Sequence, residues 1–448
     1  MNSGRYSMAI SILPGGPAMR DAFGRLPIDE APLKPIHIVA AAAVLGGAVL
    51  DGYVLGIVGP ALSIARQEMQ LSAISQGLIA SSALIGVFIG GLFFGNLADR
   101  FGRRPVFGWN LAAFIVLSVL QIFVQDVWQL VAIRLALGLA IGVEYAVGSS
   151  VLAEFSRRKG RGVLLGCFSI GWQVGFTVAF VVGSFYDGDN WRMLLASSVI
   201  PALITFVLRM TLPETPMWLK AQGRDAEARA IVDKHFGSEY AIPDVDPNPH
   251  HASPRELFTA EIWRQTLYSG LFWFCQVGPF FGIFTFLAPV LESLGLRDAT
   301  AVDMSLNAIQ IAGAVVGVFL LHWMSRRGFV IWTFVIVLLT FLALGLFPQA
   351  PTWVVVALFA TYMFVAPAAN NIQFVYPPEI FDTHIRATGI GFSAAFSRIS
   401  AAGVTYLLSW LLQKFGFSAT LVMMAGFPLL GLVLSIFWAP ETKGKHLR

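Results

Sequence analysis

The sequence predicts an all-α membrane protein with twelve transmembrane helices in two six-helix bundles and both termini in the cytoplasm. Three observations predict this fold. Of the 448 residues, 56% are hydrophobic and only 12% are charged, which leaves too little polar surface for a soluble protein. The apolar residues fall in twelve segments, each long enough to cross a hydrocarbon core of ~30 Å. The Lys and Arg residues are distributed unequally between the two sides that these crossings create.

The segments form two sets of six. The predicted spans are 36–60, 74–97, 105–124, 129–155, 162–185 and 192–211, followed by 262–292, 304–324, 329–347, 352–376, 387–411 and 418–439. The expected domains are a cytoplasmic tail (1–35), an N-terminal bundle (36–211), a cytoplasmic linker (212–260), a C-terminal bundle (261–439) and a second cytoplasmic tail (440–448). In the linker, "RDAEARAIVDKHF" predicts a short amphipathic helix and "PDVDPNPHH" a turn-rich connection. The first tail lacks the compact apolar core and cleavage site of a signal peptide, so the first span is expected to be uncleaved.

Charge placement supports the count of crossings. With the N-terminus inside, 24 of the 30 Lys and Arg residues lie on the inner side, and Arg209 is counted among them. The outer side holds only Arg66, Arg192, Arg297 and Lys414, and two arginines, Arg134 and Arg398, fall within spans. A missed or extra helix would reverse half of this distribution, so the bias predicts a multi-pass protein of the cytoplasmic (inner) membrane.

The two halves look like an internal repeat. The turn after the second span reads "LADRFGRRPVFGW", and the turn after the eighth reads "LHWMSRRGFVIW". Aligning Arg103-Arg104 with Arg326-Arg327 puts His322 in the place of Asp99, so the second copy is interpreted as degraded. A six-plus-six repeat is typical of transporters, whose substrate site lies between the halves near the middle of the membrane.

The stretch "GNLADRFGRRP" (95–105) crowds charge into one turn at the inner membrane face. Gly95 would let neighbouring helices approach closely. Asp99 would accept hydrogen bonds from Arg103 or from backbone donors of a partner helix, and Arg104 adds a further cation. We interpret this cluster as a latch that holds one conformation and releases it when the halves rock. The alternative is an ordinary positively charged inner turn, which would not require Asp99 or the glycines.

"GNLADRFGRRP" resembles the signature turn of the major facilitator superfamily. "PETPMWL" (213–219), "PETKGK" (440–445), "VYPPEIFDTHIRATG" (375–389) and "AEFSRRKGRG" (153–162) resemble motifs of its sugar-porter group, and the whole is similar to bacterial metabolite:proton symporters. The resemblance implies a ring of charged contacts between helices of each half. Its acids would be Asp99, Glu154, Glu214, Glu379 and Glu441, and its cations Arg103, Arg161 and Arg386.

Four ionisable residues fall well within spans: Asp51, Arg134, Glu144 and Arg398. A charge at mid-bilayer costs at least ~2.5–3.5 kcal/mol, so all four are expected to face an interior cavity and to pair. A carboxyl group in a dry cavity keeps its proton until a cation approaches, which makes Asp51 and Glu144 candidates for proton coupling. The alternative is a static ion pair, such as Asp51 with Arg134. By resemblance, Arg134 matches the span-four Arg of the family, and "GVEY" (142–145) is similar to a phosphate-porter motif whose acid serves transport.

Polar side chains also interrupt the apolar spans. They are Trp172, Gln173, Gln276, Asn307, Gln310, Asn370, Asn371 and Gln373. Amides and aromatic rings suit a polyol, and Arg398 suits a carboxylate, which it can bind with two parallel hydrogen bonds. Gln276 resembles the family's span-seven glutamine that contacts sugars. The alternative for each amide is a tie between helices. "QVGPFFG" (276–282) and "VAPAANN" (365–371) are candidate broken helices at such a site.

These features predict a secondary active transporter that moves a small polar metabolite (an organic acid, a sugar acid or a sugar) together with protons by alternating access. A sugar uniporter, an anion exchanger and a non-transporting nutrient sensor remain alternatives. No nucleotide-binding loop, metal-ligand cluster or nucleophile motif supports an enzyme. The expected partners are the substrate, protons and the lipid bilayer, with no cofactor beyond the proton gradient and no nucleic acid, and the chain is expected to be a monomer.

Overall fold

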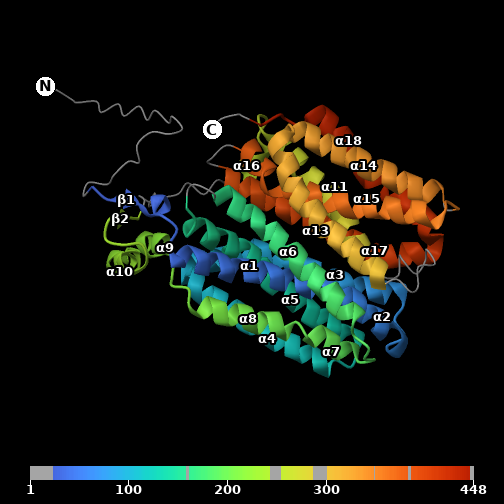
Figure 1. Cartoon of the computed structure of the whole chain (residues 1–448), viewed down its shortest axis with the longest axis horizontal. Coiled ribbons are helices and arrows are strands. Elements are labelled where there is room, and N and C mark those ends of the chain that lie inside the picture. Colours follow the sequence, from blue (N-terminus) through green and yellow to red (C-terminus); the bar gives the residue numbers. More distant parts are fainter. Residues whose placement is uncertain are drawn as a thin grey trace.

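We describe the protein from a computed structural model that covers residues 24–157, 161–242, 254–285, 300–347, 349–381 and 385–443. The N-terminal bundle consists of α1 (Pro35–Gly56), α2 (Val58–Glu68), α3 (Ala73–Phe101), α4 (Arg103–Leu120), η2 (Gln121–Phe123), α5 (Val127–Glu154), α6 (Arg161–Ser184), α7 (Trp191–Ala196) and α8 (Val199–Met210). The C-terminal bundle consists of α11 (Trp263–Thr285), α13 (Thr300–Trp323), α14 (Arg326–Leu346), α15 (Thr352–Asn370), η4 (Asn371–Phe374), α16 (Tyr376–Ile380), α17 (Arg386–Met424) and α18 (Gly426–Trp438). Figure 1 shows the two bundles side by side with their helices running along the long axis of the molecule.

Eleven helical segments are long and apolar enough to span a membrane, counted over the described residues alone. The last of them, Thr388–Trp438, has 51 residues, about twice what one crossing needs at ~1.5 Å per residue. The chain breaks within it at Gly416, whose φ of 78° lies in the left-handed region that favours glycine. This segment therefore supplies two crossings, which agrees with the predicted twelve.

Two other predicted spans are interrupted helices. The first, predicted over 36–60, continues as α2 to Glu68 after a break at Ile57, and the sixth is divided into α7 and α8.

Local signals explain two of the helix starts. The Asp126 carboxylate accepts hydrogen bonds from the backbone N–H groups of Trp128 (2.8 Å) and Gln129 (3.0 Å), which caps α5. The Ser325 hydroxyl caps α14 by accepting from the Gly328 N–H.

The linker and the N-terminal segment pack together at one end of the molecule. α10 (Asp225–His235) occupies the stretch predicted as an amphipathic helix, next to α9 (Pro216–Ala221), while "PDVDPNPHH" lies outside the described residues. η1 (Ile28–Glu30) and η3 (Pro254–Phe258) are short 3-10 helices. The strands β1 (Leu26–Pro27) and β2 (Tyr240–Ala241) pair in parallel, which the sequence had not predicted. We call this the basic end, because Arg103, Arg104, Arg326 and Arg327 begin α4 and α14 here; α2 and α7 lie at the opposite end (Figure 1).

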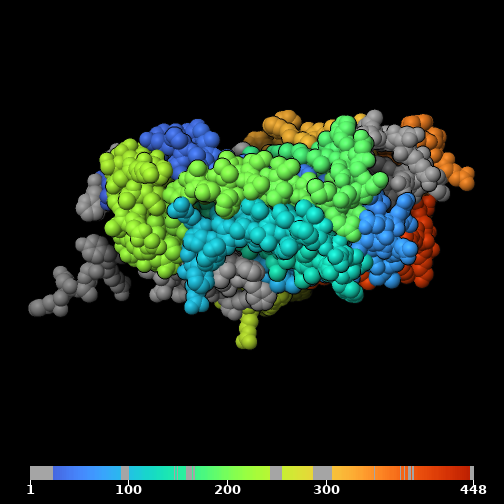
Figure 2. Space-filling view, turned by 90° about the horizontal axis from the view of Figure 1, so that it is seen from below, coloured from blue at the N-terminus to red at the C-terminus, as the bar shows by residue number. Residues whose placement is uncertain are grey.

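The outer surface of the N-terminal bundle is apolar. α4 and α8 pack side by side on the face seen in Figure 2. Large apolar side chains of these two helices, among them Trp109, Val116, Ile204 and Val207, are exposed. A row of exposed apolar residues on neighbouring helices is what contact with lipid tails requires.

Candidate functional site

A cavity lies between the two bundles, with about 460 Å³ of empty space. α5 and α6 of the N-terminal bundle form one wall, and α11, α15, η4 and α17 of the C-terminal bundle form the other. The lining residues are Tyr145, Phe168, Ser169, Trp172, Gln173, Val277, Phe280, Phe281, Asn370, Gln373 and Arg398. We call it the central cavity. Its position between the halves is where the six-plus-six repeat predicts a substrate site.

Arg398 of α17 reaches the central cavity from the C-terminal bundle. Its guanidinium lies over the ring of Tyr145 (5.2 Å to the centroid) and over that of Phe281 (5.6 Å). Within the described part of the chain it makes no ion pair. Aromatic faces stabilise a cation without neutralising its charge, so Arg398 keeps the capacity to bind an anion. The sequence predicted that Arg398 would pair with another group. In the structure it lies against the two aromatic rings and not against an acid.

Asp51 of α1 is completely buried. Neither of its carboxylate oxygens has a hydrogen-bond partner among the described residues. Its electrostatic neighbours are Glu144, Arg209 and Arg398. A buried carboxylate without partners is costly, and protonation removes most of that cost.

Glu144, in contrast, is committed to a partner. Its carboxylate pairs with the guanidinium of Arg209 on α8 and accepts a hydrogen bond of 3.5 Å from the amide of Asn110. Arg209 also donates to the Ala43 carbonyl oxygen (3.0 Å) and lies 4.0 Å over the Phe107 ring. Arg209, which the sequence counts among the inner-side cations, lies in the last turn of α8, and its side chain is buried inside the bundle. In the sequence, a buried arginine near the end of a span cannot be distinguished from an exposed arginine in the adjacent loop. Only the residues that contact it in the structure distinguish the two.

Arg134 of α5 does not pair with an acid in the described structure. It is buried, and one of its nitrogens donates to the Val54 carbonyl oxygen at 3.2 Å. The static pair of Asp51 with Arg134, weighed as an alternative from the sequence, is not formed. Of the four predicted interior charges, three thus differ in their surroundings: Glu144 is paired, Asp51 is unpartnered, and Arg134 is bound to backbone.

The predicted substrate-binding amides divide into two groups. Gln173, Asn370 and Gln373 line the central cavity together with Trp172 and Arg398. Asn307, Gln310, Asn371 and Gln276 are not among its lining residues. The amide of Asn371 donates to the Ala314 carbonyl oxygen (2.6 Å) and ties η4 to α13, and Asn307 is buried. The Asn371 contact is of the kind that the alternative predicts, a tie between helices.

Three further amide contacts reach the wall of the central cavity. Gln310 donates to Gln173, which joins the C-terminal bundle to the N-terminal one. The Gln373 amide donates both to Gln276 (3.1 Å) and to Asn370 (3.0 Å).

The sequence did not predict four aromatic residues that line the central cavity: Tyr145, Phe168, Phe280 and Phe281. With 37 Phe in the chain, a further Phe within a span carries little signal.

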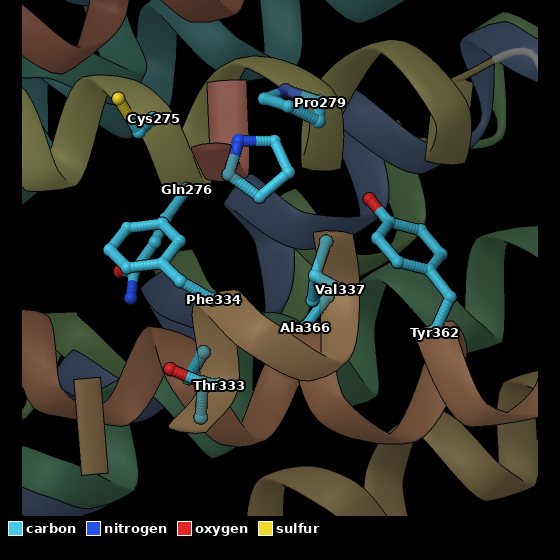
Figure 3. A pocket seen from close by; sticks show the side chains of 10 residues that line it. Cys275, Gln276, Pro279, Thr333, Phe334, Val337, Tyr362 and Ala366 are labelled. Carbon is cyan, nitrogen blue, oxygen red and sulfur yellow. The ribbon is translucent and has the colours of Figure 1, made fainter. Parts of the chain in front are cut away.

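A second hollow lies inside the C-terminal bundle, between α11, α14, α15 and α18, with about 340 Å³ of empty space. Figure 3 shows Gln276, Pro279, Phe334 and Tyr362 around it. Gln276 therefore lines this inner hollow rather than the central cavity, and it reaches the central cavity only through Gln373. Pro279 lies inside α11. Proline removes a helical hydrogen bond, so α11 has both a weak point and space beside it.

The charged cluster at the basic end of the N-terminal bundle surrounds the start of α4. The Glu214 carboxylate accepts from the backbone N–H groups of Arg103 (3.2 Å) and Arg104 (3.1 Å). The Arg103 guanidinium pairs with Glu154 at 3.4 Å. Gly102 makes the turn with a φ of 102°, and a side chain there would meet the Glu214 carboxylate. The described contacts thus fasten α4, α5 and the start of the linker to one another.

The same construction recurs in the C-terminal bundle. The Glu441 carboxylate accepts from the backbone N–H groups of Arg326 (3.0 Å) and Arg327 (3.3 Å), and the Arg326 guanidinium pairs with Glu379 at 3.1 Å. Burial acts to raise the pKa of Glu441, but hydrogen bonds from Lys443, Arg326, Ser325 and Arg327 outweigh it and lower that pKa. The second copy, which differs from the first in sequence, therefore keeps these contacts, with Arg326 as the cation. The surroundings of Gly95 and the side chains of Asp99, Arg161 and Arg386 lie outside what the structure describes.

The halves close on each other at the opposite end. A side chain at Gly77 of α3 would collide with the Tyr406 carbonyl oxygen of α17, and one at Gly59 of α2 with that of Thr285 of α11. Both contacts join the N-terminal bundle to the C-terminal one. The two bundles are therefore in close contact at the opposite end.

Two helical bundles around a buried cavity, with repeated charged clusters at one end, define a membrane transporter of the major facilitator superfamily. The family model "Sugar (and other) transporter" matches residues 39–448, and the chain belongs to this family. It is a multi-pass membrane protein and a transporter rather than an enzyme.

Named relatives agree with this assignment. The chain is 38% identical over 423 residues to "Inner membrane metabolite transport protein YgcS" of Escherichia coli (strain K12), which covers 94% of this chain and 95% of that protein. It is 35% identical over 407 residues to "Putative metabolite transport protein YaaU" of the same organism, covering 90% and 91%. Among solved structures, the xylose transporter XylE from E. coli in a partially occluded inward open conformation matches with a TM-score of 0.77. That match has 22% identity and covers 92% of this chain and 99% of XylE, so it supports the fold.

Proposed function

We propose that the protein is a proton-coupled symporter that carries a small organic acid through the membrane by alternating access. The observation that carries this proposal is Asp51, a completely buried carboxyl without a hydrogen-bond partner in the described structure, with Arg398 and the Glu144–Arg209 pair as its charged neighbours. XylE, which shares the fold, is described as a proton:xylose symporter. This protein and XylE would share coupling to protons and would differ in the substrate that they carry.

Asp51 and Glu144 would have different roles. Glu144 has its charge balanced by Arg209, so adding a proton would break a buried ion pair, which is strongly unfavourable. Asp51 has no such partner, so its proton can be taken up and released at lower cost as the surroundings change between conformations. We therefore assign proton exchange to Asp51 and a fixed structural role to Glu144 and Arg209.

Arg398 would link the proton to the substrate. It is the cation that the C-terminal bundle presents to the central cavity, and it is an electrostatic neighbour of Asp51. With the Asp51 carboxyl protonated, the positive charge of Arg398 would be left for an anionic substrate. With the substrate gone, Arg398 would favour the ionised form of Asp51 and so release the proton. Binding of the proton and of the acid would thus be mutually dependent.

The conformational cycle would use the two charged clusters at the basic end. Each cluster fastens helices within its own bundle, so each bundle would move as one body. The close contact at the opposite end, where Gly77 lies against the Tyr406 backbone, would open as the basic end closes. Asp99, Arg161 and Arg386 remain proposed members of these clusters.

The test is uptake into proteoliposomes that contain the purified protein and hold an imposed proton gradient. Labelled benzoate, gluconate and xylose serve as probes. We expect an acid to accumulate above its outside concentration when the outside is acidic, and a protonophore to abolish the accumulation. Uptake that only equilibrates and ignores the protonophore would indicate a uniporter. Uptake that requires an anion on the other side would indicate an exchanger, and absence of transport for every probe would favour a sensor.

A further inference from the structure

Aromatic rings form much of the wall of the central cavity. Tyr145 and Trp172 come from the N-terminal bundle, and Phe280 and Phe281 from the C-terminal one. The Trp172 and Phe281 ring centroids are 5.6 Å apart with 72° between the planes, and those of Phe280 and Phe281 are 5.5 Å apart at 82°. Crossed rings present both faces and edges to one space, which are the surfaces that a further aromatic ring prefers to contact.

The position of Arg398 restricts the orientation of an acid. The guanidinium carbon lies 5.2 Å from the Tyr145 ring centroid and 5.6 Å from that of Phe281, so both rings adjoin the group that would hold the carboxylate. A carboxylate held by two parallel hydrogen bonds lies in the plane of the guanidinium. In an aromatic acid, conjugation keeps the carboxylate and the ring coplanar. A flat acid bound to Arg398 would therefore have its ring close to those of Tyr145 and Phe281.

The polar groups of the cavity are poorly suited to a sugar acid. The Gln373 amide donates to both Gln276 and Asn370, and Gln173 accepts from Gln310, so these donors and acceptors are already in hydrogen bonds. A polyol would have to break such contacts to hydrogen-bond its own hydroxyls, and any hydroxyl left without a partner costs ~1–3 kcal/mol. The buried indole N–H of Trp172, in contrast, has no partner in the described region. It offers one donor, which suits a ligand with a single acceptor besides its carboxylate.

We infer that the central cavity takes a planar aromatic or heteroaromatic monocarboxylate. Arg398 would bind the carboxylate, the rings of Trp172, Phe280 and Phe281 would contact the ligand ring, and the Trp172 N–H would bind a ring nitrogen or ring substituent. This inference rests on the proposed function for the assignment of Arg398 to a carboxylate. It goes further by specifying that the rest of the substrate is a flat ring and not a hydroxylated chain.

The experiment is isothermal titration of the purified full-length protein with benzoate, pyridine-3-carboxylate, cyclohexanecarboxylate, gluconate and xylose. The first three acids are of similar size but differ in planarity and in the ring nitrogen. We expect both aromatic acids to bind about tenfold more tightly than cyclohexanecarboxylate and gluconate, and pyridine-3-carboxylate to bind more tightly than benzoate. Tighter binding of gluconate or xylose than of either aromatic acid would overturn the inference.

Two variants and one control variant test the contact with the ligand ring and the contact with the carboxylate separately. Phe281→Leu should weaken aromatic acids by roughly 3- to 10-fold and leave gluconate unchanged, whereas Phe437→Leu, at an exposed position of α18, should change neither. Arg398→Gln should weaken every acid and leave xylose unchanged. If gluconate binds best and depends on Arg398, the aromatic class is wrong while the carboxylate assignment of the proposed function stands. If no acid depends on Arg398, both are wrong.

Discussion

The two bundles are alike at the basic end and unlike inside the membrane. In each, a carboxylate from the segment after the sixth helix of the bundle, Glu214 or Glu441, accepts from two consecutive backbone N–H groups at a helix start. In each, the first arginine of that start pairs with a second glutamate. Inside, the N-terminal bundle holds Asp51 and the Glu144–Arg209 pair, whereas the C-terminal bundle contributes Arg398 and a set of mutually bonded amides.

This contrast separates two functions of charge. At the basic end, charge fastens helices into rigid units, and both bundles need that equally if they are to rock against each other. Inside the membrane, a charged side chain costs free energy, so it is found where it binds a ligand or changes its protonation state. The contacts that hold helices together at the basic end therefore occur in both bundles, whereas the interior charges of the two bundles differ. We propose proton exchange for the N-terminal bundle and recognition of the substrate anion for the C-terminal bundle.

The largest expected effect concerns the interior pair. Arg209→Gln leaves the Glu144 carboxylate buried without its cation, and breaking a buried pair in this way costs ~3–5 kcal/mol. We expect a large fall in the melting temperature of the purified protein. The double variant Glu144→Gln with Arg209→Gln should recover most of it, because no uncompensated charge remains. Arg224→Gln is the matched control, since its pair with Glu227 is exposed and its loss should hardly matter. A double variant as unstable as the single one would show that the pair is not a unit.

The next effect tests the likeness of the two basic-end clusters. Glu214→Gln and Glu441→Gln each weaken two hydrogen bonds to a negatively charged acceptor. Because both carboxylates are remote from the central cavity, we expect turnover to fall roughly tenfold in each case with substrate affinity little changed. Transport rates and titration measured on the same preparations check this. Loss of turnover for only one of the two variants would show that the repeated contacts have diverged in function.

The smallest effect distinguishes the two turns themselves. Gly102 adopts a φ of 102°, and an added side chain would come within 2.6 Å of the Glu214 carboxylate, whereas the corresponding Ser325 caps its helix with φ −67°. Gly102→Ala should cost ~1–2 kcal/mol of stability through strain, and Ser325→Ala ~1 kcal/mol through loss of the cap. Thermal unfolding of both variants measures the difference. If Gly102→Ala were neutral, the tight approach of Glu214 would not be required.

The sequence could predict the fold and much of the basic end because both depend on local patterns. Spans follow from the length of apolar runs, and the glutamates and arginines of the clusters sit in short motifs. The interior could not be assigned in this way. Arg209 pairs across a sequence distance of 65 residues with Glu144, and the Phe residues of the cavity resemble every other membrane Phe. The amide pairing of Gln373 with Gln276 joins η4 to α11, and nothing in either segment specifies the other.

The central claim, that the unpartnered acid of the N-terminal bundle carries the proton, is tested most directly by Asp51→Asn in proteoliposomes. Two measurements are made with the labelled compound that the wild type transports: accumulation driven by a proton gradient, and counterflow exchange without a gradient. Asn keeps the size of the side chain and cannot release a proton. The account predicts that accumulation is abolished while counterflow continues at a rate near that of the wild type. Accumulation by the Asp51→Asn variant against a concentration gradient would contradict the claim and place the proton site elsewhere.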